Sequence, residues 1–128
     1  MTDAVLDASA LLALLKDEPG ADKVAAVIGT AAISAVNVQE VAKEMLREGA
    51  TFEAARGVLN ELNLDVRSHD SEAAYASAAL DEHTREFGRG LGDRTCMALG
   101  MQLGVPVLTA DREWKRVEVE GLTLEHIR

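Results

Sequence analysis

The stretch AVLDASALLALL, residues 4–15, contains the pattern that decides the fold. Ala4 to Leu6 form a short apolar run typical of a buried strand, and residues 9–16 continue as a helix rich in leucine and alanine. Asp7 lies between the two elements, inside apolar sequence. Burying an isolated charge is costly unless a partner or a cation compensates it. Asp7 is therefore the first residue for which a functional role is considered.

The same alternation of strands and helices continues along the chain. Further strands are expected at 31–34, 64–67, 105–109 and 122–127, and helices at 21–28, 37–48, 51–62, 70–84, 93–103 and 111–116. Strands joined by helices require crossover connections. We therefore predict one α/β domain over residues 1–128, with a mainly parallel central sheet flanked by helices on both faces. Ligands of such sheets bind at the carboxyl ends of the strands.

Composition and cysteine content narrow the class of protein. Of the 128 residues, 48% are hydrophobic and 27% are charged, which is ordinary for a globular domain with its own core. Cys96 is the single cysteine, which excludes an intramolecular disulfide and a cysteine metal cluster. The start of the chain does not resemble a signal peptide, and no apolar run is long enough to cross a bilayer. A cytoplasmic protein without membrane association is the expectation.

The charge balance restricts how the chain can bind a polyanion. With 22 acidic and 13 basic residues its net charge is −9, which disfavours nucleic-acid binding by bulk electrostatics. Aromatic residues make up only 3%, so an aromatic platform for base stacking is not expected either. If this protein acts on a polyanion, metal ions or a basic partner must offset the local repulsion.

Four acidic residues follow strands or begin helices. Asp7 and Asp111 come after predicted strands, Glu40 lies on the first turn of the helix after residues 31–34, and Asp93 begins another helix. We call these four residues the acidic quartet. If the sheet brings them together, they repel one another and cannot all stay ionised without a cation. Hard divalent ions with oxygen ligands, Mg²⁺ or Mn²⁺, would satisfy them.

Each acid also has a purely structural interpretation. Asp7, Asp93 and Asp111 could each cap a helix, because an aspartate at the N-cap accepts from free backbone N–H groups. Asn37 and Glu40 are spaced as a capping box, with Asn37 as the cap. Capping does not explain why Asp7 lies within an apolar run, nor why all four acids are expected at one edge of the sheet.

Three segments together resemble a known family. They are VLDASALLALL (5–15), ISAVNVQEVAKEML (33–46) and GLGDRTCMALGMQLGVPVLTADREW (90–114). They resemble the PIN-domain nucleases and, more narrowly, the VapC toxins of prokaryotic toxin–antitoxin modules, over nearly the whole chain. The resemblance implies that the acidic quartet is the metal site and that Ser9 and Thr109 support it. Gly90 differs from the serine that many relatives have at that position.

The resemblance also implies an activity and partners. It implies an endoribonuclease that uses Mg²⁺ or Mn²⁺ and leaves a 5′-phosphate and a 3′-hydroxyl. Asp7, Asp93 and Asp111 would be metal ligands, and Glu40 a ligand or the group that orients the attacking water. Arg94 and Arg112 are candidates for contacts with RNA phosphate, with surface ion pairs as the alternative. A VapB-like antitoxin and a homodimer are the implied protein partners.

Two other functions stay open at this stage. One is a catalytically silent PIN fold that serves only for binding. The other is a receiver-like signalling domain. Such a domain needs paired acids after the first strand, an aspartate after the third and a lysine late in the chain. Here Asp7 stands alone, and no lysine directly follows VLT (107–109). Cleavage of DNA is also chemically open, because a metal site does not read the 2′-hydroxyl.

Overall fold

The computed structural model describes residues 1–128. Its centre is a five-stranded sheet in the order β3-β2-β1-β4-β5. The strands are β1 (Ala4–Leu6), β2 (Ala31–Ser34), β3 (Asp65–Arg67), β4 (Val107–Thr109) and β5 (Leu124–His126). Every neighbouring pair of strands is parallel, so their carboxyl ends lie along one edge. The prediction of a parallel sheet is confirmed.

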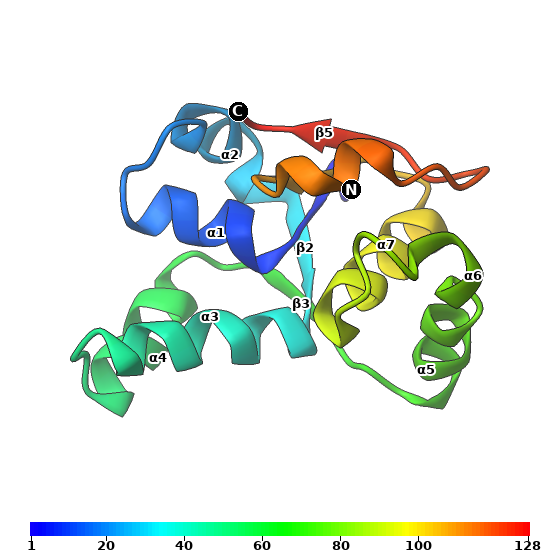
Figure 1. The fold of residues 1–128 in the computed structure, drawn as a ribbon. Helices are drawn as coiled ribbons and strands as arrows, with labels where there is room; N and C mark the ends of the chain where they lie inside the picture. Colours follow the sequence, from blue (N-terminus) through cyan, green and yellow to red (C-terminus); the bar gives the residue numbers. More distant parts are fainter.

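Helices cover both faces of the sheet, as predicted (Figure 1). Helices α1 (Ala8–Leu15), α2 (Ala21–Val27), α3 (Ala35–Arg47) and α4 (Phe52–Glu61) lie on one side. Helices α5 (Ser71–Ala78), α6 (Asp81–Thr84) and α7 (Leu91–Leu103) lie on the other. Two short 3₁₀ helices, η1 (Ile28–Thr30) and η2 (Arg112–Arg116), precede β2 and follow β4. No helix is long and apolar enough to cross a membrane.

The apolar run that opens the chain is explained by burial on both faces of the sheet. Ala4 and Leu6 belong to the core beneath α1–α3, whereas Val5, which points the other way, packs in the core beneath α7. All three side chains are almost fully buried. Strands buried on both faces read as continuous apolar sequence, which is why Ala4–Leu6 shows no alternation.

The second core holds the only tryptophan. Trp114, on η2, is fully buried and packs with Met97 and Cys96 of α7 and with Val107 of β4. This contact fixes the segment after β4 against the sheet. Asp111, which immediately precedes η2, is therefore held at the carboxyl edge.

The strands expected at 105–109 and 122–127 are shorter, Val107–Thr109 and Leu124–His126, and three helices differ from their predicted bounds. The helix expected over 70–84 is two helices, because the chain turns at residues 79–80 and buries Leu80 in the second core. Helix α7 begins at Leu91 rather than Asp93, with Gly90 at its N-cap. Helix α3 begins at Ala35, and its cap is Ser34, whose hydroxyl accepts from the N–H of Val36. Asn37 therefore lies inside α3 and is not a cap.

Candidate active site at the carboxyl edge of the sheet

Asp7 lies directly after β1 and is 4% exposed. It is the N-cap of α1, and its Oδ1 accepts a 2.8 Å hydrogen bond from the N–H of Ala10. The hydroxyl of Ser9 donates to Oδ1 at 2.7 Å, and the hydroxyl of Thr109, on β4, donates to Oδ2 at 2.7 Å. The capping interpretation is therefore correct for Asp7. Capping does not account for the two hydroxyl donors, because the cap needs only the bond from Ala10.

The pKa of Asp7 reflects a conflict between burial and these donors. Burial raises this pKa from its ordinary value of 3.8 to about 6, although the three hydrogen bonds oppose the change. The negative charge of Asp93 raises it further. The structure thus places a second carboxylate within electrostatic reach of Asp7. A cation at this point would favour the ionised form of both groups.

Asp93 is the third residue of α7 and is half-buried. Its Oδ2 accepts from the N–H of Gly90, so it caps α7 from inside the helix rather than from the N-cap position. Burial raises the pKa of Asp93, and the charges of Glu40 and Asp111 raise it further. All four acids of the quartet therefore interact electrostatically through Asp93, as expected if the carboxyl ends of the strands gather them.

Asp111 is positioned by the same hydroxyl that holds Asp7. Its own N–H donates a 3.0 Å hydrogen bond to Oγ1 of Thr109, which in turn donates to Asp7. Its side chain caps η2 by accepting from the N–H of Glu113. Ser9 makes a parallel link, because its hydroxyl accepts from the N–H of Ala110. Ser9 and Thr109 thus connect the ends of β1 and β4.

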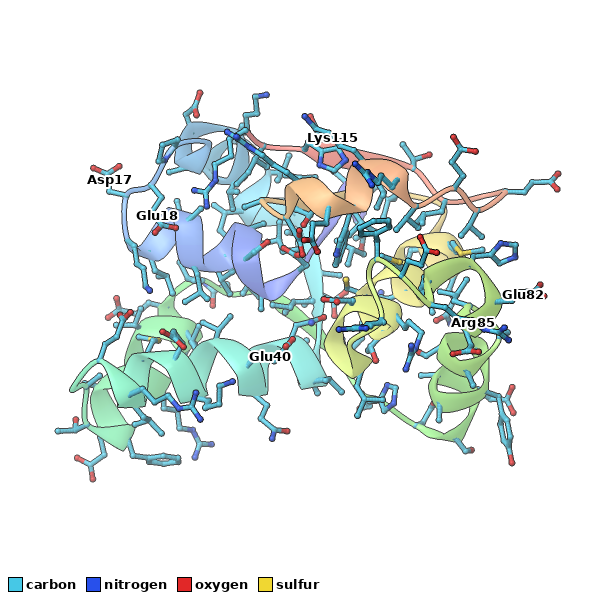
Figure 2. The ribbon with its side chains drawn as sticks, viewed as in Figure 1. Asp17, Glu18, Glu40, Glu82, Arg85 and Lys115 are labelled. Carbon is cyan, nitrogen blue, oxygen red and sulfur yellow. The ribbon has the colours of Figure 1, made fainter.

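Glu40 is held by a residue whose role the sequence interpretation missed. The Nδ2 group of Asn37, which is 1% exposed, donates to Oε1 of Glu40 at 2.7 Å and to the carbonyl of Gly92 at 3.1 Å. This amide links α3 to the first turn of α7. Figure 2 shows Glu40 on the part of α3 that lies toward α7. A polar residue on the inner face of an otherwise amphipathic helix was the available signal.

Gly92 completes this arrangement because it lacks a side chain. A Cβ at this position would lie 2.6 Å from Cδ of Glu40, far inside van der Waals contact. The glycine of the LGD sequence (91–93) therefore leaves the space that the Glu40 carboxylate occupies. The sequence interpretation did not assign it a role.

The donor atoms suit a hard divalent cation, although they are not gathered into a finished cage. Carboxylate and hydroxyl oxygens are the ligands that Mg²⁺ and Mn²⁺ prefer. Asp7 retains acceptor capacity, because its two oxygens offer about four lone-pair sites. As the side chains stand, no three of the His, Cys, Asp and Glu groups are close enough together to hold a metal ion. Binding would require the carboxylates to turn toward a common point.

The two arginines differ in their surroundings. Nη1 of Arg94 lies 3.9 Å from Oδ1 of Asp81, so this cation is turned toward α6. Arg112 begins η2, is exposed and has no acidic partner within ion-pair distance. Arg112 is therefore the better placed of the two to meet a substrate phosphate.

The single cysteine lies in the core. The thiol of Cys96 is fully buried, and burial raises its pKa well above the ordinary value.

Comparison with known proteins identifies the family and the fold. The PIN domain family model matches residues 4–120. No curated protein matches the chain. The fold is similar to DNA-bound VapBC from Salmonella typhimurium (18% identity, 100% of both chains, TM-score 0.72). It is also similar to a toxin–antitoxin complex from Klebsiella pneumoniae (17%, 94% of this chain and 96% of that one, 0.73) and to VapBC2 from Rickettsia felis bound to promoter DNA (15%, 98% of both, 0.73).

Proposed function

Because this chain belongs to the PIN-domain family, we propose that it is a toxin of the VapC type that hydrolyses RNA with the help of Mg²⁺ or Mn²⁺. The observation that supports this most directly is the environment of Asp7. A carboxylate that is 4% exposed receives three hydrogen-bond donors, one of them from a neighbouring strand. A helix cap requires neither the burial of the Asp7 carboxylate nor the hydrogen bond that Thr109 donates from β4.

We assign Asp7, Asp93 and Asp111 as the groups that would hold the ion, and Glu40 as a ligand or as the group that orients the attacking water. When bound, a divalent ion lowers the pKa of water and stabilises negative charge on a phosphodiester. Ser9 and Thr109 keep the Asp7 carboxylate in one orientation, because both hydroxyls donate to it. Asn37 and Gly92 do the same for Glu40. Arg112 would meet a phosphate of the substrate, and Arg94 offers a further cation beside Asp93.

The products follow from the leaving group, which we take to be the 3′ oxygen, as the family resemblance implies. Attack on phosphorus with departure of the 3′ oxygen leaves a 5′-phosphate and a 3′-hydroxyl. The negative charge of the quartet repels RNA until a cation is bound, which makes metal loading a condition for substrate binding. Cleavage and binding would therefore both depend on the ion.

We further propose that the chain functions with a VapB-like antitoxin and as a homodimer. The similar solved structures are named as toxin–antitoxin complexes, which supports the first partner. Exposed apolar side chains lie on the surface: Leu46, Phe52, Val58, Val66, Tyr75 and Leu91. Surfaces of this kind are suited to protein contacts. A basic residue of the antitoxin entering the acidic quartet would block the ion and the substrate together.

The test is cleavage of total RNA by the purified, partner-free protein, with 5′-end mapping. It is run with Mg²⁺, with Mn²⁺ and with chelator, beside Asp7→Asn as the inactive variant and Asp3→Asn, at the opposite end of β1, as the matched control. Discrete metal-dependent cuts with 5′-phosphates, lost only in Asp7→Asn, support the proposal. A folded protein that cuts in no metal would instead indicate a catalytically silent binding module.

A further inference from the structure

A cavity of about 400 Å³ opens at the same edge of the sheet as the acidic quartet. It lies between α5 and α7, which Figure 1 shows side by side, and the connection from β3 to α5 forms one wall. Its lining residues are Ser34, Arg67–Asp70, Glu72, Ala73, Ala76, Thr95, Ala98, Leu99 and Gln102. Ser34 ends β2 and Arg67 ends β3, so the cavity sits where α/β sheets bind ligands.

Helix α7 separates the cavity from the quartet but contributes to both. Thr95, Ala98, Leu99 and Gln102 have the spacing of a single helix face, and this face lines the cavity. Asp93, two residues before Thr95, lies on the same first part of α7, and its side chain accepts from the N–H of Gly90. Ser34 caps α3, the helix that carries Glu40. Because the cavity shares α7 and the end of β2 with the quartet, we place there a nucleotide next to the one whose phosphate lies at the quartet.

The lining suits a nucleobase. Ala73, Ala76, Ala98 and Leu99 offer apolar surface for the flat faces of a base. Thr95 is 5% exposed and lines the cavity, where its hydroxyl can donate to or accept from a base edge. The hydroxyl of Ser34, 2% exposed, accepts from Val36 and still has its proton to donate. Arg67 is paired with Asp65 at 2.9 Å, and Asp70 and Glu72 add negative charge, so a phosphate is disfavoured as the occupant.

We propose that this cavity binds one unpaired base of the RNA substrate, next to the scissile phosphate. Sequence-specific recognition of RNA acts mainly on unpaired bases, whose edges and faces are free. The volume is within the range of small-molecule sites. The cavity would then make the cleavage site depend on the identity of one base. Recognition of this kind needs neither an aromatic stacking platform nor a positive net charge, and this chain has 3% aromatic residues and a net charge of −9. This inference rests on the proposed RNA cleavage.

The test fills the cavity from an exposed position. Ala76 lines it and is solvent-exposed on α5, so Ala76→Trp occupies the space without disturbing the core. Ala78→Trp, exposed on the same helix but outside the lining, is the matched control. Substrates are oligoribonucleotides that span a mapped cut, each with one abasic position. The readouts are kcat/KM and, with Ca²⁺ in place of the active ion so that the carboxylates stay neutralised, binding measured by fluorescence anisotropy.

We expect one abasic position to lower kcat/KM of the wild type and of Ala78→Trp by about tenfold, as for loss of one or two hydrogen bonds. In Ala76→Trp the intact and abasic substrates should differ by less than about twofold. Retention of the full ratio in Ala76→Trp, or no sensitive position in the wild type, overturns the inference. If the wild type cleaves no RNA, the proposed function fails. Binding of the four single-stranded homopolymeric oligoribonucleotides to Ala76→Trp and to Ala78→Trp then decides the cavity separately, and equal binding by both variants overturns the inference.

Discussion

Thr109 donates a 2.7 Å hydrogen bond to Asp7, which lies 102 residues earlier in the chain. The same hydroxyl accepts from the N–H of Asp111 at 3.0 Å. One fully buried side chain on β4 thus orients one member of the acidic quartet and the backbone of another. Because β1 and β4 are adjacent parallel strands, this contact depends on the sheet and not on local sequence.

Replacing Thr109 by valine should therefore weaken both stability and activity. Valine keeps the shape but leaves the Asp7 carboxylate without one donor and the Asp111 N–H without an acceptor. We expect a loss of about 1.5–3 kcal/mol in the free energy of unfolding, measured by denaturation with the fluorescence of Trp114. RNA cleavage should fall about 10–100-fold, as for other residues that orient metal ligands. Thr109→Ser, which keeps the hydroxyl, should retain most of the activity; equal losses in both variants would contradict this role.

Asp7 should make the stability of the metal-free protein fall as pH rises. Its pKa is about 6 in the folded protein against 3.8 ordinarily, so the folded state binds more protons between these values. The free energy of unfolding then decreases through this pH window, by about 3 kcal/mol in total for this group. In Asp7→Asn this contribution to the slope is absent. Parallel urea denaturation of both proteins at about pH 4, 5, 6 and 7 measures the difference, and identical slopes would refute it.

The sequence revealed the acids but not the way they are held. Asp7, Asp93 and Asp111 were identified because strand ends and helix starts are visible as local patterns. The links through Ser9 to Ala110 and through Asn37 to Gly92 join segments far apart in the chain, and no local pattern contains them. The strand order, with β1 between β2 and β4, is equally a property of the whole sheet.

The wrong boundaries have local causes. An alanine-rich run such as residues 73–79 favours a helix, but it does not show where the chain must turn to bury Leu80. Asn37 matches a capping box by spacing alone, whereas Ser34 both ends β2 and caps α3. Leu80 is buried in the second core, and Asn37 is bonded to Gly92 of α7. Sequence periodicity does not report such contacts.

Divalent ions should stabilise the protein through Asp7. At about a hundredfold excess over the dissociation constant, a bound ion adds about 2.7 kcal/mol to the free energy of unfolding. We expect Mg²⁺ or Mn²⁺ to raise Tm in the wild type, and more at about pH 8 than at pH 5, because protons compete for the same carboxylates. Thermal denaturation with and without the ion measures this effect. A rise of equal size in Asp7→Asn would place the ion elsewhere.

Gly92→Ala should separate the position of Glu40 from the stability of the fold. The new methyl group would collide with the Glu40 carboxylate, which is the mobile end of a flexible side chain and can move away. Alanine also favours a helix over glycine by about 0.5–1 kcal/mol, so Tm should hold or rise. Cleavage should fall by about tenfold or more because Glu40 leaves its hydrogen bond with Asn37. Gly57→Ala, on exposed α4 with nothing within 4 Å of the new atom, should gain similar stability with unchanged activity. If both variants cleave RNA equally well, the position of the Glu40 carboxylate beside Gly92 is not required for cleavage.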